Sequence, residues 1–204
     1  MIPRLTSALV FAACAAVATA APQTFDFKDP KGVNSIQFHL DSVLEPISGT
    51  ANGITGTVSF DPAAAAKTSG KIVVATNSLV VPNSTMTGHL QGKGWLNAEE
   101  NPEIVFEIAG LSDVKTSGDT TTATAQGSFT LNGTTKEIAV PVKLTVIPDG
   151  VGKRLGKPEL KGDLLVVRGN FTIDREAYGL QPGKNLDKVA KEIELTIAMV
   201  GGSS

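Results

Sequence analysis

The sequence predicts an all-β protein in which short antiparallel strands form a sandwich or a closed barrel. Eight or nine strand-like segments follow one another at nearly regular intervals, separated by Gly, Pro, Asn and Asp. In most of these segments apolar and polar residues alternate, which gives a strand one buried face. No apolar pattern of helical period continues for more than two turns. Composition alone does not choose between the sandwich and the barrel.

The strands expected in the first half of the chain are mostly short. The segment from Ile54 to Phe60 alternates and ends at Asp61-Pro62, a typical turn sequence. The run from Lys71 to Val81 is longer and rich in Val and Thr, so it is expected to form one strand. The expected strands of this half are residues 25–27, 36–40, 54–60, 71–81 and 103–111.

The second half continues the pattern around a hairpin. Asn132-Gly133 is the strongest short hairpin signal, and it joins an expected strand at 123–131 to another at 136–147. Pro141 lies inside the second strand and predicts an edge position or a bulge, because proline cannot donate a backbone hydrogen bond. Two more strands are expected at residues 164–173 and 192–200.

Residues 1–20 have the features of a signal peptide. Arg4 gives a positive start, an apolar run follows that is too short to cross a bilayer, and Ala18-Thr19-Ala20 is a small-residue cleavage site. Residues 21–204 would then form a single domain of a periplasmic or secreted protein. After cleavage 17 basic and 20 acidic residues remain, a net charge of −3, which gives no reason to expect nucleic acid as a partner.

Cys14 is the only cysteine and lies within this leader. The exported chain would therefore have no disulfide, so its stability would come from a hydrophobic core. The alternative is that Phe11-Ala12-Ala13-Cys14 is a lipidation site, which would anchor the chain to a membrane through Cys14. Without that anchor, membrane contact is expected to be transient only.

The sequence shows no catalytic or metal-binding constellation, so we predict neither an enzyme nor a bound metal or cofactor. Thiol chemistry is excluded once Cys14 is removed, and the two histidines, His39 and His89, are not in a metal-binding spacing. His39 is expected on the solvated face of its strand. The chain also lacks the nucleophile elbow of hydrolases and the phosphate-binding P-loop.

Three segments of the chain resemble motifs of one known family. The first, "MTGHLQGKGWLNAEENPEIVFEI", has a short His-Leu helix, a bulky apolar pair and a Pro-x-Ile-x-Phe start of a strand, and in these features it resembles the YceI-like polyisoprenoid-binding family. The second, "GSFTLNGTTKEIAVPVKL", resembles its Gly-x-Leu-Thr-x-x-Gly-x-Thr-Lys hairpin, with Phe129 for the Leu. The third, "GNFTIDREAYGL", resembles its Phe-x-Ile-Asp-Arg-x-x-Phe-Gly motif, with Tyr178 as the aromatic residue. The segment from Val151 to Gly162 looks like an extended loop.

The resemblance implies an eight-stranded antiparallel lipocalin-like barrel with a short helical lid near residues 87–96. It also implies that the barrel holds a long apolar lipid, a polyisoprenoid or an isoprenoid quinone. Together with the signal-peptide features, this predicts an exported protein that sequesters or carries that lipid. Eight strands leave an interior just wide enough for packed side chains or one slender ligand. Alternation and the lid together predict these ligand-binding residues: Phe38, Leu40, Phe60, Val74, Leu90, Trp95, Leu96, Phe106, Ile108, Phe129, Leu131, Phe171, Ile173 and Tyr178.

Two other functions remain open from the sequence. The barrel could have a solid core, with Trp95 filling one end and a protein partner bound outside, or it could act as an enzyme on a lipid. In the carrier hypothesis, residues 88–96 fold across the mouth as a lid. A homodimer is compatible with the sequence.

Arg175 is a candidate for one of two roles. Its planar guanidinium suits the anionic head group of a lipid at the mouth, but it also suits an internal acid such as Asp174 or Asp29. We favour the structural role, because most arginines in turns bond to nearby protein oxygens.

Overall fold

The computed structural model describes residues 21–203, which form eleven strands, two α-helices and three short 3₁₀-helices. The predicted signal peptide and Cys14 lie outside the described residues. The strands are β1 (Gln23–Asp26), β2 (Ser35–Leu40), β3 (Ile47–Ala51), β4 (Ile54–Phe60), β5 (Ser69–Ala75), β6 (Leu79–Val80), β7 (Glu103–Ser117), β8 (Thr120–Leu131), β9 (Thr134–Ile147), β10 (Leu164–Asp174) and β11 (Glu192–Ser203). The helices are α1 (Ser84–Gln91), α2 (Gly150–Leu155), η1 (Pro62–Lys67), η2 (Thr76–Ser78) and η3 (Arg175–Tyr178). None of the helices within residues 21–203 is both long and apolar enough to cross a bilayer.

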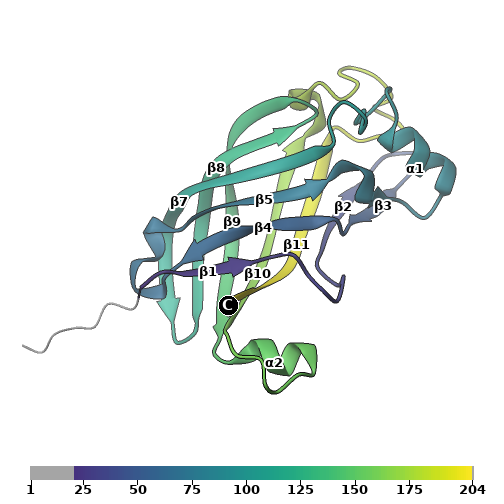
Figure 1. Cartoon of the computed structure of the whole chain (residues 1–204). Coiled ribbons are helices and arrows are strands. Elements are labelled where there is room, and N and C mark those ends of the chain that lie inside the picture. The colour runs from purple at the N-terminus through teal and green to yellow at the C-terminus, as the bar shows by residue number, and fades with distance from the viewer. Residues whose placement is uncertain (1–20, 204) are drawn as a thin grey trace, which may run out of the picture.

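Eight strands close into an antiparallel barrel, which confirms the expected fold (Figure 1). The strand order around the ring is β1, β4, β5, β7, β8, β9, β10 and β11. Phe25 pairs with Ser203 and Asp26 with Gly202, so β1 and β11 close the ring. Ring closure gives each of these strands a partner on both sides, although β9 pairs with β10 only from Val142 onward.

The other three strands extend the wall on one side. β11 pairs with β2 through residues 194–198, β2 pairs with β3, and β3 pairs with β6. In Figure 1, β2 and β3 lie below and beside α1, at the end of the barrel opposite α2. The sequence did not indicate β3. The run from Lys71 to Val81, predicted as one strand, is divided into β5 and β6 by η2.

The β8–β9 hairpin forms where the sequence predicts it. Asn132 and Gly133 have φ angles of 50° and 70°, the left-handed values that a tight two-residue hairpin turn needs. Pro141 lies opposite Thr124 of β8, but the pairing of β9 with β10 begins only at Val142. Pro141 therefore has a ladder partner in β8 only, which is compatible with the predicted edge position.

Both helices differ from the expected boundaries. The lid helix was predicted near residues 87–96, but α1 covers Ser84–Gln91 because the Asn83 side chain accepts a hydrogen bond from the backbone N–H of Met86 and caps it. Turns follow from Gly92 onward. The segment expected as an extended loop at 151–162 contains α2, which ends at Gly156 in a left-handed conformation.

A buried ion pair joins α2 to the loop before β2. The Asp29 carboxylate lies 2.8 Å from Nη1 of Arg154 and also accepts hydrogen bonds from the backbone N–H groups of Lys31, Val33 and Asn34. Burial alone would raise the pKa of Asp29, but these four bonds outweigh it and hold the pKa well below its usual range. Asp29 is thus bound to Arg154, not to Arg175 as one of the sequence-based alternatives had it.

We expect the Asp29→Asn variant to lose about 2 kcal/mol of stability at neutral pH, since bonds to a charged group are lost. The folded pKa lies below that of the unfolded chain. The stability from Asp29 is therefore fully present above about pH 5 and is lost as the pH falls through the acid range. Thermal melting at about pH 7 and about pH 3 should show a difference between wild type and variant that shrinks at the lower pH. Asp119→Asn, in the exposed β7–β8 turn, is the control, and a difference that does not change with pH would contradict this role for Asp29.

Candidate ligand-binding cavity

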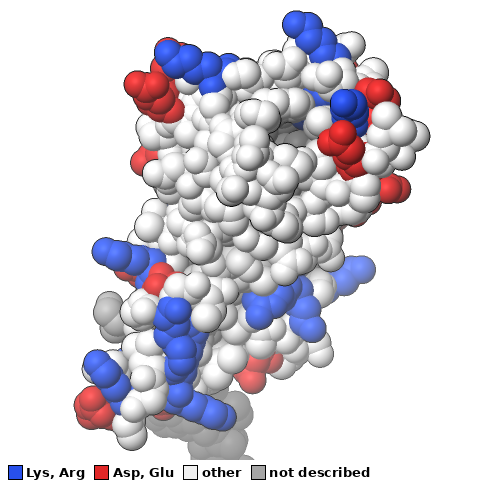
Figure 2. Space-filling view, turned by 90° about the vertical axis from the view of Figure 1, so that its right-hand side faces the viewer, with Lys and Arg blue, Asp and Glu red and all other residues white. Residues whose placement is uncertain are grey.

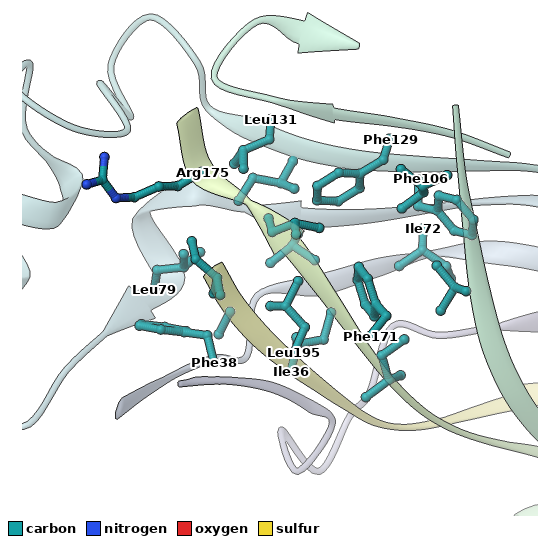
Figure 3. A pocket seen from close by; sticks show the side chains of 18 of the residues that line it. Ile36, Phe38, Ile72, Leu79, Phe106, Phe129, Leu131, Phe171, Arg175 and Leu195 are labelled. Carbon is teal, nitrogen blue, oxygen red and sulfur yellow. The ribbon is translucent and has the colours of Figure 1, made fainter. Parts of the chain in front are cut away.

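The barrel encloses an apolar cavity of about 460 Å³. Figure 3 shows its side chains, which come from strands all around the barrel and point toward one another. The volume lies within the range of small-molecule sites, so the interior is not solid. Twelve of the predicted ligand-binding residues line this cavity: Phe38, Leu40, Val74, Leu90, Trp95, Leu96, Phe106, Ile108, Phe129, Leu131, Phe171 and Ile173.

The other two predicted residues, Phe60 and Tyr178, are buried but do not line the cavity. Phe60 ends β4 opposite Gln23 and belongs to the same packed cluster as Phe25 and Phe27. Alternation placed Phe60 on the correct face but could not give its depth in the barrel. Tyr178 lies in η3 behind Phe129, with the two rings edge to face and their centroids 5.6 Å apart. Burial raises the pKa of the Tyr178 hydroxyl.

Sequence reasoning missed most of the lining that comes from the later strands. The same alternation, applied to β9, β10 and β11, would have found the inward-facing side chains. They are Ile138, Val140, Val142, Leu144, Val167, Ile193, Leu195, Ile197 and Met199.

Phe38 owes its place in the cavity wall to a glycine on the neighbouring strand. Phe38 pairs with Gly49, and a β-carbon at Gly49 would overlap the ring of Phe38 and the carbonyl oxygen of Val80. Since Gly49 has no side chain, the ring of Phe38 packs directly over its backbone. The inward face of β3 is therefore filled by a side chain from β2.

We expect Gly49→Ala to destabilise the protein by about 1–3 kcal/mol, because the Phe38 ring and the backbone of Val80 must both move. Gly88→Ala is the matched control. A β-carbon at Gly88, within α1, would meet nothing within 4 Å beyond its own helix backbone, so alanine there should stabilise by up to about 1 kcal/mol. Denaturant unfolding of both variants measures the contrast, and equal stabilities would show that Phe38 does not depend on this contact.

The predicted lid segment, residues 88–96, covers one end of the cavity. It leaves α1 at Gly92 and turns back, and the backbone N–H of Leu96 donates to the carbonyl of Leu90. Leu96 is buried in a cluster with Leu131 and Ile173. The Gln91 side chain donates to the carbonyl of Leu79, which fixes the helix to β6. The segment is thus held at the mouth by specific contacts.

Arg175 lies at the same end, fully buried, with its guanidinium turned away from the apolar side chains (Figure 3). Nε, Nη1 and Nη2 together donate five hydrogen bonds of 2.5–3.1 Å, one for each guanidinium N–H group. The acceptors are the backbone carbonyls of Leu180, Gln181, Lys184, Val189 and Ala190. The guanidinium also stacks 5.6 Å from the ring of Trp95.

These contacts support the structural role of Arg175 and correct its predicted partner. We expected an acid, either Asp174 or Asp29, but the partners are carbonyl groups of the chain between η3 and β11. Asp174 instead lies 3.1 Å from Nζ of Lys191. The guanidinium donors are occupied, so Arg175 has none left for an anionic head group. Its stack on Trp95 connects this loop to the lid segment.

Exposed polar side chains surround the open part of the mouth. Glu45, His89, Asn185 and Lys188 all line the outer end of the cavity, and Lys188 Nζ lies 3.8 Å from Glu45 Oε1. Figure 2 shows a hollow in the upper part of the face, with side chains of both charges at its rim. The cavity is therefore apolar inside and polar at its entrance.

The histidines lie in two different settings. His89 is at the mouth, whereas His39 lies on the outer side of β2, with Nδ1 2.8 Å from Oγ of Ser48. In the part of the chain that the structure describes, no three or more His, Cys, Asp and Glu side chains gather in a way that could hold a metal ion.

Comparisons with known proteins agree with this architecture. The model of the YceI-like domain matches residues 29–200. A UPF0312 protein of Yersinia pestis (strain Pestoides F) is 30% identical over 200 residues, which cover 95% of this chain and 92% of that relative. BcnA of Burkholderia cenocepacia superposes with a TM-score of 0.65 at 22% identity, covering 82% of this chain and 95% of that one.

A second solved structure is similar over a larger share of the chain. It is a polyisoprenoid binding domain from Saccharophagus degradans implicated in plant cell wall breakdown, with a TM-score of 0.63 at 10% identity. The match covers 90% of this chain and 99% of that one. At these identities, the two solved structures establish the fold.

Proposed function

Because the chain belongs to the YceI-like domain family, we propose that it binds a long apolar lipid, a polyisoprenoid or an isoprenoid quinone, inside its barrel. The observation that carries this proposal is the apolar cavity of about 460 Å³. A cavity of this size lined by Phe, Leu, Ile and Val favours an apolar ligand, because transfer of an apolar chain from water into it is favourable. The polyisoprenoid binding domain with the same fold supports this ligand class.

The polar groups at the mouth favour a neutral head group. Arg175 has all its donors bonded to backbone carbonyls, and Lys188 is beside Glu45. A phosphate or carboxylate would have to compete with these contacts, whereas a hydroxyl or quinone head group would not. A polyprenol or a quinone is therefore the ligand we propose.

The protein would act as a carrier in an aqueous compartment outside the cytoplasm. The signal-like sequence of residues 1–20 motivates this location, and lipidation of Cys14 would give an anchored form of the same carrier. An apolar lipid in that compartment needs to be enclosed by the barrel, because its exposure to water is unfavourable. We propose binding and transport, with no catalytic step.

Extraction of the purified protein with organic solvent, followed by mass spectrometry of the extract, tests the proposal. We expect an isoprenoid lipid at a near-stoichiometric amount. An extract without lipid, together with failure to take up an added polyprenol or quinone, would exclude the carrier function. Chemical turnover of an added lipid that is lost in a His89→Ala variant would indicate an enzyme instead.

A further inference from the structure

We propose that the mouth of the barrel docks on the surface of a lipid bilayer through three exposed aliphatic side chains, Val43, Leu44 and Leu186. This inference rests on the proposed function, since it assigns the surface from which the cavity would take up its lipid. The three side chains are 85%, 61% and 49% exposed. Exposed aliphatic residues grouped at one site are typical of protein or membrane contacts.

The three residues project from two loops that are bonded to each other. Val43 and Leu44 lie between β2 and β3, and Leu186 lies between η3 and β11. The backbone N–H of Leu44 donates to the carbonyl of Asp187 at 2.9 Å, and the N–H of Ala190 donates to the hydroxyl of Ser42 at 2.8 Å. Arg175 fixes the second loop from inside. The two loops, residues 41–46 and 179–191, therefore form one ordered surface that carries the three aliphatic side chains. This surface is called the platform below.

This platform is continuous with the cavity. The cavity entrance is lined by Glu45, Asn185 and Lys188. In the chain, Glu45 directly follows Leu44, and Asn185 directly precedes Leu186. A lipid that leaves the cavity through this entrance passes the two loops that carry Leu44 and Leu186. If the platform touches a bilayer, the apolar chain moves from the cavity to the membrane with little exposure to water.

The charges near the platform favour a bilayer over a charged protein partner. The two loops carry the acids Asp41, Glu45 and Asp187 and the bases Lys184, Lys188 and Lys191, so their formal charges cancel. Glu45 and Lys188 also form an ion pair. Such a surface has little to gain from the charge of a partner, so the burial of its aliphatic side chains must provide the attachment. We therefore expect binding to zwitterionic vesicles that is insensitive to salt and is not increased by anionic lipid.

The opposite end of the barrel provides a matched control. Val33, Ile147 and Leu160 lie around α2 and are 62%, 41% and 38% exposed. The segment at 153–161 carries three lysines, and Figure 2 shows Lys and Arg side chains gathered toward this lower end. Its aliphatic residues are also exposed, but neither they nor the residues of α2 line the cavity. This end therefore distinguishes a general apolar attraction to the bilayer from docking at the mouth.

The test is flotation of the protein with phosphatidylcholine vesicles. We expect the wild type to float with them, and the variant Val43→Ser/Leu44→Ser/Leu186→Ser to lose about fivefold or more of its bound fraction. The variant Val33→Ser/Ile147→Ser/Leu160→Ser should bind like the wild type. Thermal melting of both triple variants should stay near that of the parent, because all six side chains are exposed.

Several outcomes would overturn the inference. The mouth variant is the one changed at Val43, Leu44 and Leu186, and the α2-end variant is the one changed at Val33, Ile147 and Leu160. The inference is wrong if the wild type does not float, or if the mouth variant floats as well as the wild type. It is also wrong if only the α2-end variant loses binding, or if binding needs phosphatidylglycerol. The amount of lipid that the mouth variant retains after gel filtration distinguishes a failure of the docking proposal from a failure of the proposed carrier function. If the mouth variant keeps its lipid but exchanges it with vesicles at the wild-type rate, docking at the mouth is wrong while the carrier function stands.

Discussion

Replacement of Arg175 by glutamine is expected to lower the melting temperature by about 6–12 °C, the effect of roughly 3 kcal/mol in a protein of this size. Glutamine offers two N–H donors where arginine offers five. At least three of the five backbone carbonyls between η3 and β11 would lose their partner, and the stack on Trp95 would disappear. An unpaired buried polar group costs more than the bond itself contributes.

Lipid retention should change less than stability in this variant, because the guanidinium has no donor directed at the ligand. Differential scanning calorimetry and the solvent-extracted lipid content give the two readouts. Arg168→Gln is the matched control: Arg168 is in β10, the strand that directly precedes η3, and donates to two backbone carbonyls, but it is exposed. An Arg175→Gln variant that melts like the parent yet has lost its lipid would assign Arg175 to the head group instead.

The largest expected effect on lipid binding comes from Ala125→Phe. Ala125 is buried on β8 between Leu111 and Val140, and its methyl group faces the cavity. A phenyl ring at this position enters space that the ligand would occupy. We expect lipid retention to fall by about tenfold or more, a loss of at least ~1.4 kcal/mol in binding. Stability should change little, because the ring fills an existing void.

Ala139→Phe is the control for this substitution. Ala139 pairs with Gln126 on the neighbouring position of the same hairpin, but it faces solvent. Retention of an added polyprenol after gel filtration, measured by mass spectrometry, compares the two variants. Equal retention in Ala125→Phe and the parent would mean that the lipid does not occupy this part of the cavity.

The sequence predicted the strands with strong alternation and missed those without it. Phe106 and Ile108 of β7 face the cavity as expected, because both lie on the apolar face of an alternating run. β3 was missed because its inward positions are Ile47, Gly49 and Ala51, and the small residues there hide the pattern. The space over Gly49 is filled by Phe38, a contact between strands that no local pattern encodes.

The polar part of the site was harder to predict than its apolar lining. Arg175 was recognised as a structural candidate, but not its acceptors. Every residue carries a backbone carbonyl, so the five carbonyls that surround the guanidinium leave no signature in the sequence. Similarly, alternation showed that Phe60 points inward, but not that it packs within the buried cluster without lining the cavity. Depth along a barrel depends on register, which is set by distant pairings.

The pairing that closes the barrel has a consequence for how the chain folds during translation. Phe25 pairs with Ser203, so β1 cannot find this neighbour until β11 has been made. β11 is also the partner of β2 and β10, so three strands keep a free edge until this last segment arrives. Pairings this distant along the chain slow folding. A nascent chain would therefore remain open, without a sealed interior, until β11 has emerged.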